Sequence, residues 1–194
     1  MKYWVQYESS FQVLADEKTI IGPIYKYRSR QLALEDVTKT KQKDSLVIFG
    51  KHQKAITTIS ICEDFGYALV GDKSGSAVQY DLGEGRSKFK VLRDYANLGI
   101  GELLSSASKG HLVVFGGNES KFVVIDVQSR RILGVPTVTA VNLILSVAIC
   151  SVSDSKCFVC VTGQGLDYSG NKSDVFDFSE LVCKDKIQFR NPLD

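Results

Sequence analysis

Three stretches of this 194-residue chain repeat one order of strands and turns. Each reads as an apolar strand, a turn, an apolar strand, a glycine-rich turn, and a strand closed by an aromatic or apolar residue and Asp. The closing pairs are Tyr80-Asp81, Ile125-Asp126 and Phe176-Asp177. The strands before them end at Gly71, Gly116 and Gly163. The closing aspartates lie 45 and 51 residues apart and the glycines 45 and 47, so the chain consists of equivalent units.

A repeat of this length with about four strands predicts the blades of a β-propeller. We therefore expect an all-β fold, a propeller-like array of three to four four-stranded antiparallel blades. The whole chain, 1–194, forms a single domain in this prediction. Its units are 1–44 (partial), 45–92, 93–134 and 135–183, followed by a tail to 194. Continuous apolar runs such as Phe122 to Ile125 are typical of sheets covered on both faces.

The unit 45–92 resembles a WD-repeat blade, which opens with Gly-His and closes with Trp-Asp. Here the opener is Gly50-Lys51-His52 and the closer is Tyr80-Asp81, and the resemblance extends over about residues 45 to 183. In that family a buried Asp before the third strand bonds the opening His. Counting six residues back from the closing positions gives Ser74, Glu119 and Gly170. None of these three residues is Asp, so we expect this polar network of the family to be absent or degenerate in every unit.

The number of units raises the question of how the ring closes. WD-type propellers usually have about seven blades, within the general range for propellers. Three units with fragments at both ends would leave apolar blade faces uncovered, which favours aggregation. Either four blades close tightly, or the chain is part of a larger propeller completed by another segment or partner. We favour the larger propeller.

Composition indicates an intracellular, cytoplasmic protein with no membrane partner. The formal net charge of +2 is too small to imply a nucleic-acid or membrane partner. No apolar run reaches the length of a spanning helix, and Gln6 and Glu8 interrupt the start where a signal peptide would have its apolar core. The five cysteines are an odd number without the spacing of a disulfide framework.

The sequence predicts no catalytic, cofactor-binding or metal-binding residues. Cys157 and Cys160 have metal-site spacing but lie in one expected strand, where residues three apart point to opposite faces. The only histidines are His52, at a structural position of the repeat, and His111. No Gly-x-Ser-x-Gly elbow or phosphate loop accompanies them, and Gly83-Glu84-Gly85 lacks the third glycine of a dinucleotide loop.

One segment has the character of a partner or nucleic-acid surface. Its residues are Tyr25, Lys26, Tyr27, Arg28 and Arg30. In an extended strand the three cations would line one face and the two tyrosines the other, an arrangement that can grip phosphates and stack bases. The alternative, which we favour, is a solvated strand edge whose charges prevent unwanted pairing.

These patterns support two hypotheses about function. The first is a non-catalytic protein-interaction scaffold, a propeller-type subunit or module of a larger intracellular assembly. The second is an accessory RNA-binding subunit of an RNA-processing or tRNA-modifying enzyme. The tract from Val70 to Gly75 resembles repeats in a propeller subunit of a tRNA methyltransferase, and the basic segment would bind the RNA. A propeller hydrolase ranks last, because no triad is present.

Overall fold

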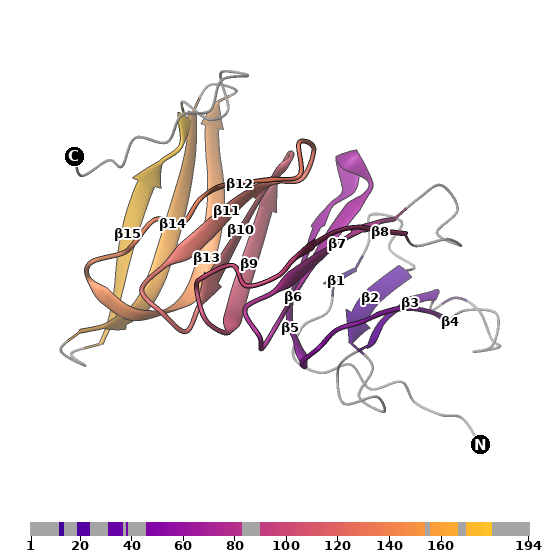
Figure 1. Ribbon diagram of the computed structural model, residues 1–194. Coiled ribbons are helices and arrows are strands. Elements are labelled where there is room, and N and C mark those ends of the chain that lie inside the picture. The colour runs from indigo at the N-terminus through magenta and orange to yellow at the C-terminus, as the bar shows by residue number, and fades with distance from the viewer. Residues whose placement is uncertain are drawn as a thin grey trace.

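The residues that the structure describes form four antiparallel sheets that follow one another along the chain (Figure 1). The computed structural model describes residues 12–13, 19–23, 31–36, 38, 46–82, 90–153, 156–166 and 170–179. Within these residues the only named element besides strands is a short 3-10 helix, Glu63–Phe65. The all-β fold class and the antiparallel blades are confirmed.

The first two sheets lie at the N-terminal end of the array. The first consists of β1 (Gln12–Val13), β2 (Thr19–Pro23), β3 (Gln31–Asp36) and β4 (Leu46–Lys51), in that order. The second consists of β5 (Ile56–Cys62), β6 (Tyr67–Asp72), β7 (Ala77–Asp81) and β8 (Lys90–Tyr95).

The expected unit boundary at residue 45 differs from the strand pairing. We placed the strand that begins there in the second unit, but β4 pairs with β3 and completes the first sheet. The segment expected to be a partial blade therefore supplies three strands of a four-stranded sheet. At this boundary the expected unit and the sheet are out of step by one strand, because the chain leaves the first sheet from its outer strand, β4, and enters the second at its inner strand, β5.

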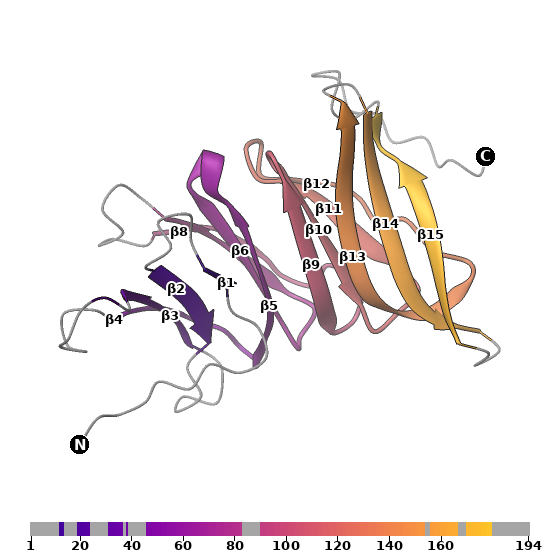
Figure 2. The ribbon, with the colours of Figure 1, turned by 180° about the vertical axis from the view of Figure 1, so that it is seen from behind.

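The last two sheets lie at the C-terminal end (Figure 2). The third consists of β9 (Leu103–Lys109), β10 (Leu112–Gly117), β11 (Phe122–Asp126) and β12 (Arg131–Gly134). The fourth consists of β13 (Val141–Ser153), β14 (Lys156–Gly165) and β15 (Asn171–Asp177). The tail that we expected after residue 183 lies outside the described residues.

The first strands of successive sheets pack side by side, β5 along β9 and β9 along β13. Each sheet therefore has a backward face toward the preceding sheet and a forward face toward the following one. Side chains of facing sheets form three apolar clusters. The cluster between the first and second sheets contains Ile21 and Tyr80, and the one between the second and third contains Leu69 and Phe115. The cluster between the third and fourth sheets contains Phe122 and Val161. Burial on both faces explains the continuous apolar runs of β10 and β11.

The closing positions are equivalent, as the repeat predicted. Tyr80, Ile125 and Phe176 lie on third strands and pair with second-strand residues of the backward face. Gly71 and Gly116 are also equivalent, because the next sheet approaches each closely. A Cβ on Gly71 would lie 2.6 Å from the Leu103 Cδ1 atom, and one on Gly116 would lie 2.4 Å from the Ile144 Cγ2 atom.

The third glycine is displaced by one residue from this pattern. In each of the last three sheets the closing Asp pairs with a residue of the second strand. The same number of residues after that partner, the second strand has Gly71 in the second sheet, Gly116 in the third and Thr162 in the fourth. Gly163 instead faces β13 of its own sheet, where its Cβ would meet the Leu143 carbonyl oxygen at 2.2 Å. A shift of one residue reverses the face that a strand position presents. The glycine spacing alone therefore gave the wrong equivalence in the last unit.

Candidate functional site: a buried polar network and the blade faces

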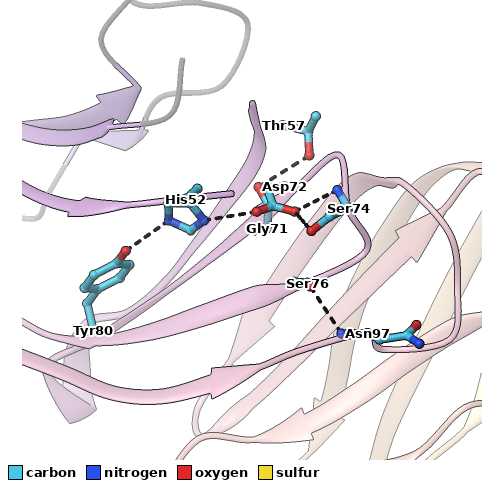
Figure 3. A network of polar contacts seen from close by, with 8 residues as sticks. All are labelled: His52, Thr57, Gly71, Asp72, Ser74, Ser76, Tyr80 and Asn97. Atoms are coloured by element: carbon cyan, nitrogen blue, oxygen red, sulfur yellow. Dashed lines mark hydrogen bonds and ion pairs between the residues drawn. The ribbon is translucent and has the colours of Figure 1, made fainter. Parts of the chain in front are cut away.

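A histidine network links the entry of the second sheet to its third strand (Figure 3). The Tyr80 hydroxyl oxygen lies 3.0 Å from His52 Nε2, and His52 Nδ1 lies 3.5 Å from the Asp72 carboxylate. The second distance is long for a hydrogen bond, and Nδ1 has no close hydrogen-bond partner.

The Asp72 carboxylate also organises the turn after β6. It accepts hydrogen bonds from the Ser74 backbone nitrogen, at 2.8 Å, and from the Ser74 hydroxyl. Gly75 takes a φ of +76°, which glycine adopts without strain. Burial acts to raise the pKa of Asp72, but the contacts with His52 and Ser74 outweigh it and hold that pKa below the ordinary value of 3.8.

The expectation that this network is missing was wrong for the second unit. A fixed count of six residues from Tyr80 reached Ser74, whereas the carboxylate comes from Asp72, two residues earlier. β6 extends through Asp72 and ends beside the turn that enters the sheet. The chain therefore has an acidic residue for this network, but at a different spacing from the closing residue than the family pattern.

The network lies in the interior of the protein. His52 is 3% exposed, and Asp72 and Tyr80 are each 2% exposed. The turn that it holds contacts the next connection, because the Leu98 backbone nitrogen donates to the Gly75 carbonyl oxygen at 2.8 Å. The arrangement therefore positions the links between sheets.

Polar contacts that we did not anticipate join the second sheet to the third. Gln79 is fully buried; its amide nitrogen donates to the Val127 carbonyl oxygen at 2.9 Å, and its amide oxygen accepts from the Tyr95 hydroxyl at 2.9 Å. The Thr58 and Ser106 hydroxyls lie 2.6 Å apart across the same interface. The available sequence signal was a Gln at residue 79 between the apolar residues Val78 and Tyr80 of an expected strand.

The remaining candidate groups lie apart from one another. His111 is half-buried and meets Phe65 edge-on, with ring centroids 6.0 Å apart. Cys157 is buried and Cys160 is half-buried on the alternating strand β14, consistent with opposite faces. Within the described ranges, no group of three or more His, Cys, Asp or Glu side chains is placed to hold a metal ion. Tyr25, Lys26, Tyr27, Arg28 and Arg30 lie outside the described residues.

Comparison with known proteins identifies the class of fold. Neither a family model nor a curated protein matches the chain in sequence. A structure described as "Structure of U3-55K" matches with a TM-score of 0.65 at 11% identity, covering 89% of this chain and 53% of that chain. "Crystal structure of RRP9 WD40 repeats" matches with a TM-score of 0.63 at 10% identity, covering 89% and 52%.

The likeness at these identities concerns the fold, which is that of a partial WD-repeat propeller. This chain spans about half the length of these two solved chains. Its WD-type features are His52 at the entry of a blade, Asp72 in the turn after β6, and Tyr80 where the repeat has Trp. In the part of the chain that the structure describes, no helix is long and apolar enough to cross a bilayer.

Proposed function

We propose that this protein is a non-catalytic interaction scaffold, a WD-type propeller subunit or module that holds other proteins in a larger intracellular, cytoplasmic assembly. The observation that carries the proposal is that the His52, Asp72 and Tyr80 side chains contact one another in the interior. These three have the composition of a catalytic set, yet all are buried and their contacts hold the links between sheets. The WD-type fold supports the proposal, since propellers bind partners through exposed edges and turns.

The test is a native pull-down of the tagged full chain, with and without ribonuclease. We expect the same proteins to co-purify in both samples, because protein surfaces rather than RNA hold them. Absence of any stoichiometric protein partner would contradict the scaffold. Turnover of a substrate by the pure chain, abolished by His111→Ala without loss of fold, would also contradict it.

The second candidate is an accessory RNA-binding subunit, favoured by the basic and aromatic segment. Replacing Lys26, Arg28 and Arg30 together by Ala would then weaken RNA binding and reduce its salt dependence, by about one unit of slope for each lost phosphate contact. The matched control is the triple Ala variant at Lys54, Lys90 and Lys109, three exposed cations elsewhere. Equal RNA affinity of the two variants would exclude a specific role for the segment.

A further inference from the structure

Arg93 rests on the ring of Tyr95 at the margin between the second and third sheets. Arg93 pairs in register with Gln79, which places both side chains on the forward face of the second sheet. Its guanidinium carbon lies 5.1 Å from the centroid of the Tyr95 ring, within the range of a cation–π contact. Tyr95 is 3% exposed, and its hydroxyl donates to the buried Gln79 side chain. The ring is therefore a fixed platform for an exposed guanidinium.

Arg130 belongs to the turn between β11 and β12 of the third sheet. Its φ of +57° is a left-handed conformation that is uncommon for residues other than glycine. Asp126 holds this turn, because its carboxylate accepts hydrogen bonds from two backbone nitrogens of the turn and from the Ser129 hydroxyl. The Val127 carbonyl oxygen accepts a hydrogen bond from Gln79 of the second sheet. The turn that carries Arg130 is therefore anchored both within its own sheet and to the preceding one.

The two arginine charges act on the same buried hydroxyl. Burial raises the pKa of Tyr95 to about 12, and the positive charges of Arg93 and Arg130 oppose that rise. Both guanidiniums thus lie near the Tyr95 hydroxyl, and both arginines are exposed. In the part of the chain that the structure describes, neither arginine forms an ion pair with a carboxylate. Their donor groups are therefore available to a ligand.

The acidic side chains nearest to this margin are placed elsewhere. Asp126 is 7% exposed, and its carboxylate is engaged by the turn that it holds. Asp94 pairs in register with Val78, so it lies on the opposite face of β8 from Arg93. Among the described residues, the margin therefore carries a local positive charge.

The surroundings of the two arginines indicate the kind of ligand. A phosphate group suits them, because the guanidinium fork matches its oxygens and donates charge-assisted hydrogen bonds. The Tyr95 ring is buried beneath Arg93 and has no free face on which a nucleic-acid base could stack. Ile132 follows close after Arg130, pairs with Ile125 on the backward face, and is 44% exposed. A phosphate beside an apolar contact favours a phosphorylated peptide over RNA.

We infer that Arg93 and Arg130 form a binding site for a phosphorylated serine or threonine of a protein partner. Arg93 donates from the edge of a guanidinium that rests on Tyr95, and Arg130 donates from the anchored turn. An apolar side chain next to the phosphorylated residue contacts Ile132. The inference rests on the proposed scaffold function, because it gives the chemistry by which one partner is recognised.

The test uses a pool of peptides with one fixed phosphoserine and randomised neighbours, and the same pool with serine in its place. Each pool is passed over the immobilised full chain, and the retained peptides are sequenced by mass spectrometry. We expect enrichment from the phosphoserine pool only, chiefly of peptides with an apolar residue beside the phosphoserine. Arg93→Gln combined with Arg130→Gln should weaken binding of an enriched peptide about a hundredfold, since charge-assisted hydrogen bonds from each guanidinium contribute about tenfold or more.

The matched control is Lys54→Gln combined with Arg131→Gln, which removes the same charge at two exposed positions. Lys54 lies in the connection between β4 and β5, and Arg131 pairs with Asp126 on the forward face of the third sheet, away from the second. We expect this variant to bind like the native chain.

A lysine variant separates charge from geometry. Arg93→Lys combined with Arg130→Lys keeps both charges but loses the planar fork, so its affinity should fall between those of the native chain and the glutamine variant. A thermal melt of each variant checks its fold. If the glutamine variant unfolds, the lysine variant decides the test, and an affinity equal to that of the native chain would overturn the inference.

The outcomes separate this inference from the proposed function. Equal retention of the two peptide pools, or an equal loss of binding in the glutamine and control variants, would overturn the inference. If protein partners still co-purify with the native chain, the scaffold stands. A single-stranded RNA that binds more tightly than the enriched peptides and depends on Arg93 and Arg130 would also overturn it. Phosphopeptide binding that only the glutamine variant loses would support the inference, even where a pull-down without partners contradicts the scaffold.

Discussion

The Nε2 atom of His52 lies 3.0 Å from the hydroxyl oxygen of Tyr80, at the junction between the first and second sheets. The repeat family has Trp at this closing position, and a tyrosine hydroxyl can reach the imidazole directly. His52 has almost no contact with water, so this bond satisfies a ring nitrogen that would otherwise be buried without a partner. The contact between His52 and Tyr80 therefore stabilises the fold.

Replacing Tyr80 with Phe should destabilise the protein by about 1–3 kcal/mol, because the ring remains while His52 loses its hydrogen-bond partner. Urea unfolding measures the effect. Tyr67→Phe, at a half-buried position of the same sheet, is the matched control. Equal unfolding midpoints for the two variants would show that the contact contributes nothing.

Asp72 should make stability depend on pH in the acidic range. Its folded pKa lies below the ordinary value of 3.8, so the stabilisation is present above that value and is lost as the pH falls through the folded pKa. The stability difference between the native chain and Asp72→Asn should be largest near neutral pH and shrink below about pH 4. Urea titrations across this range measure it, and a difference that grows in acid would contradict the sign.

Val123→Asp should cost several kcal/mol, on the order expected for an unpaired buried charge. Val123 is 0% exposed between the second and third sheets. Val91→Asp, at the exposed valine of β8, should stay within about 0.5 kcal/mol. Thermal melts of the two variants should therefore separate widely. Coincident melting temperatures would be incompatible with the assigned core.

Gly116→Ala should destabilise by about 1–3 kcal/mol through overpacking. The new Cβ would lie 2.4 Å from Ile144 Cγ2 and 2.9 Å from Val147 Cγ1. Combining it with Ile144→Ala removes the nearest methyl, so the two changes should cost less together than the sum of their separate effects. Urea unfolding of both single variants and the double variant forms the cycle. Strict additivity would argue against the close approach.

The purified chain should contain no stoichiometric zinc. Cys157 and Cys160 lie three residues apart on β14, so their thiols are directed to opposite sides of the sheet. Elemental analysis gives the metal content. Zinc that disappears in the Cys157→Ser, Cys160→Ser variant would refute this prediction.

The sequence by itself determined the local properties of this protein. Runs of apolar residues predicted inner strands such as Phe122 to Ile125. The closing Tyr80, Ile125 and Phe176 predicted three equivalent positions, which the strand pairing confirms. These signals depend on period-two patterns and on turns, which neighbouring residues set among themselves. The all-β, propeller-type fold could therefore be read before any contact was known.

Tertiary structure decided which strands pair, in which register, and what covers each face. β4 joins the first sheet and Asp72 supplies the carboxylate, because distant segments meet at these places. In the last sheet the pairing of the closing Asp puts Thr162, rather than a glycine, at the position of Gly71 and Gly116. Val124 and Val175 occupy equivalent positions, yet one is buried and the other exposed. Burial is a property of the neighbouring sheet, and the local pattern around Val124 and Val175 does not show which of the two positions has such a neighbour.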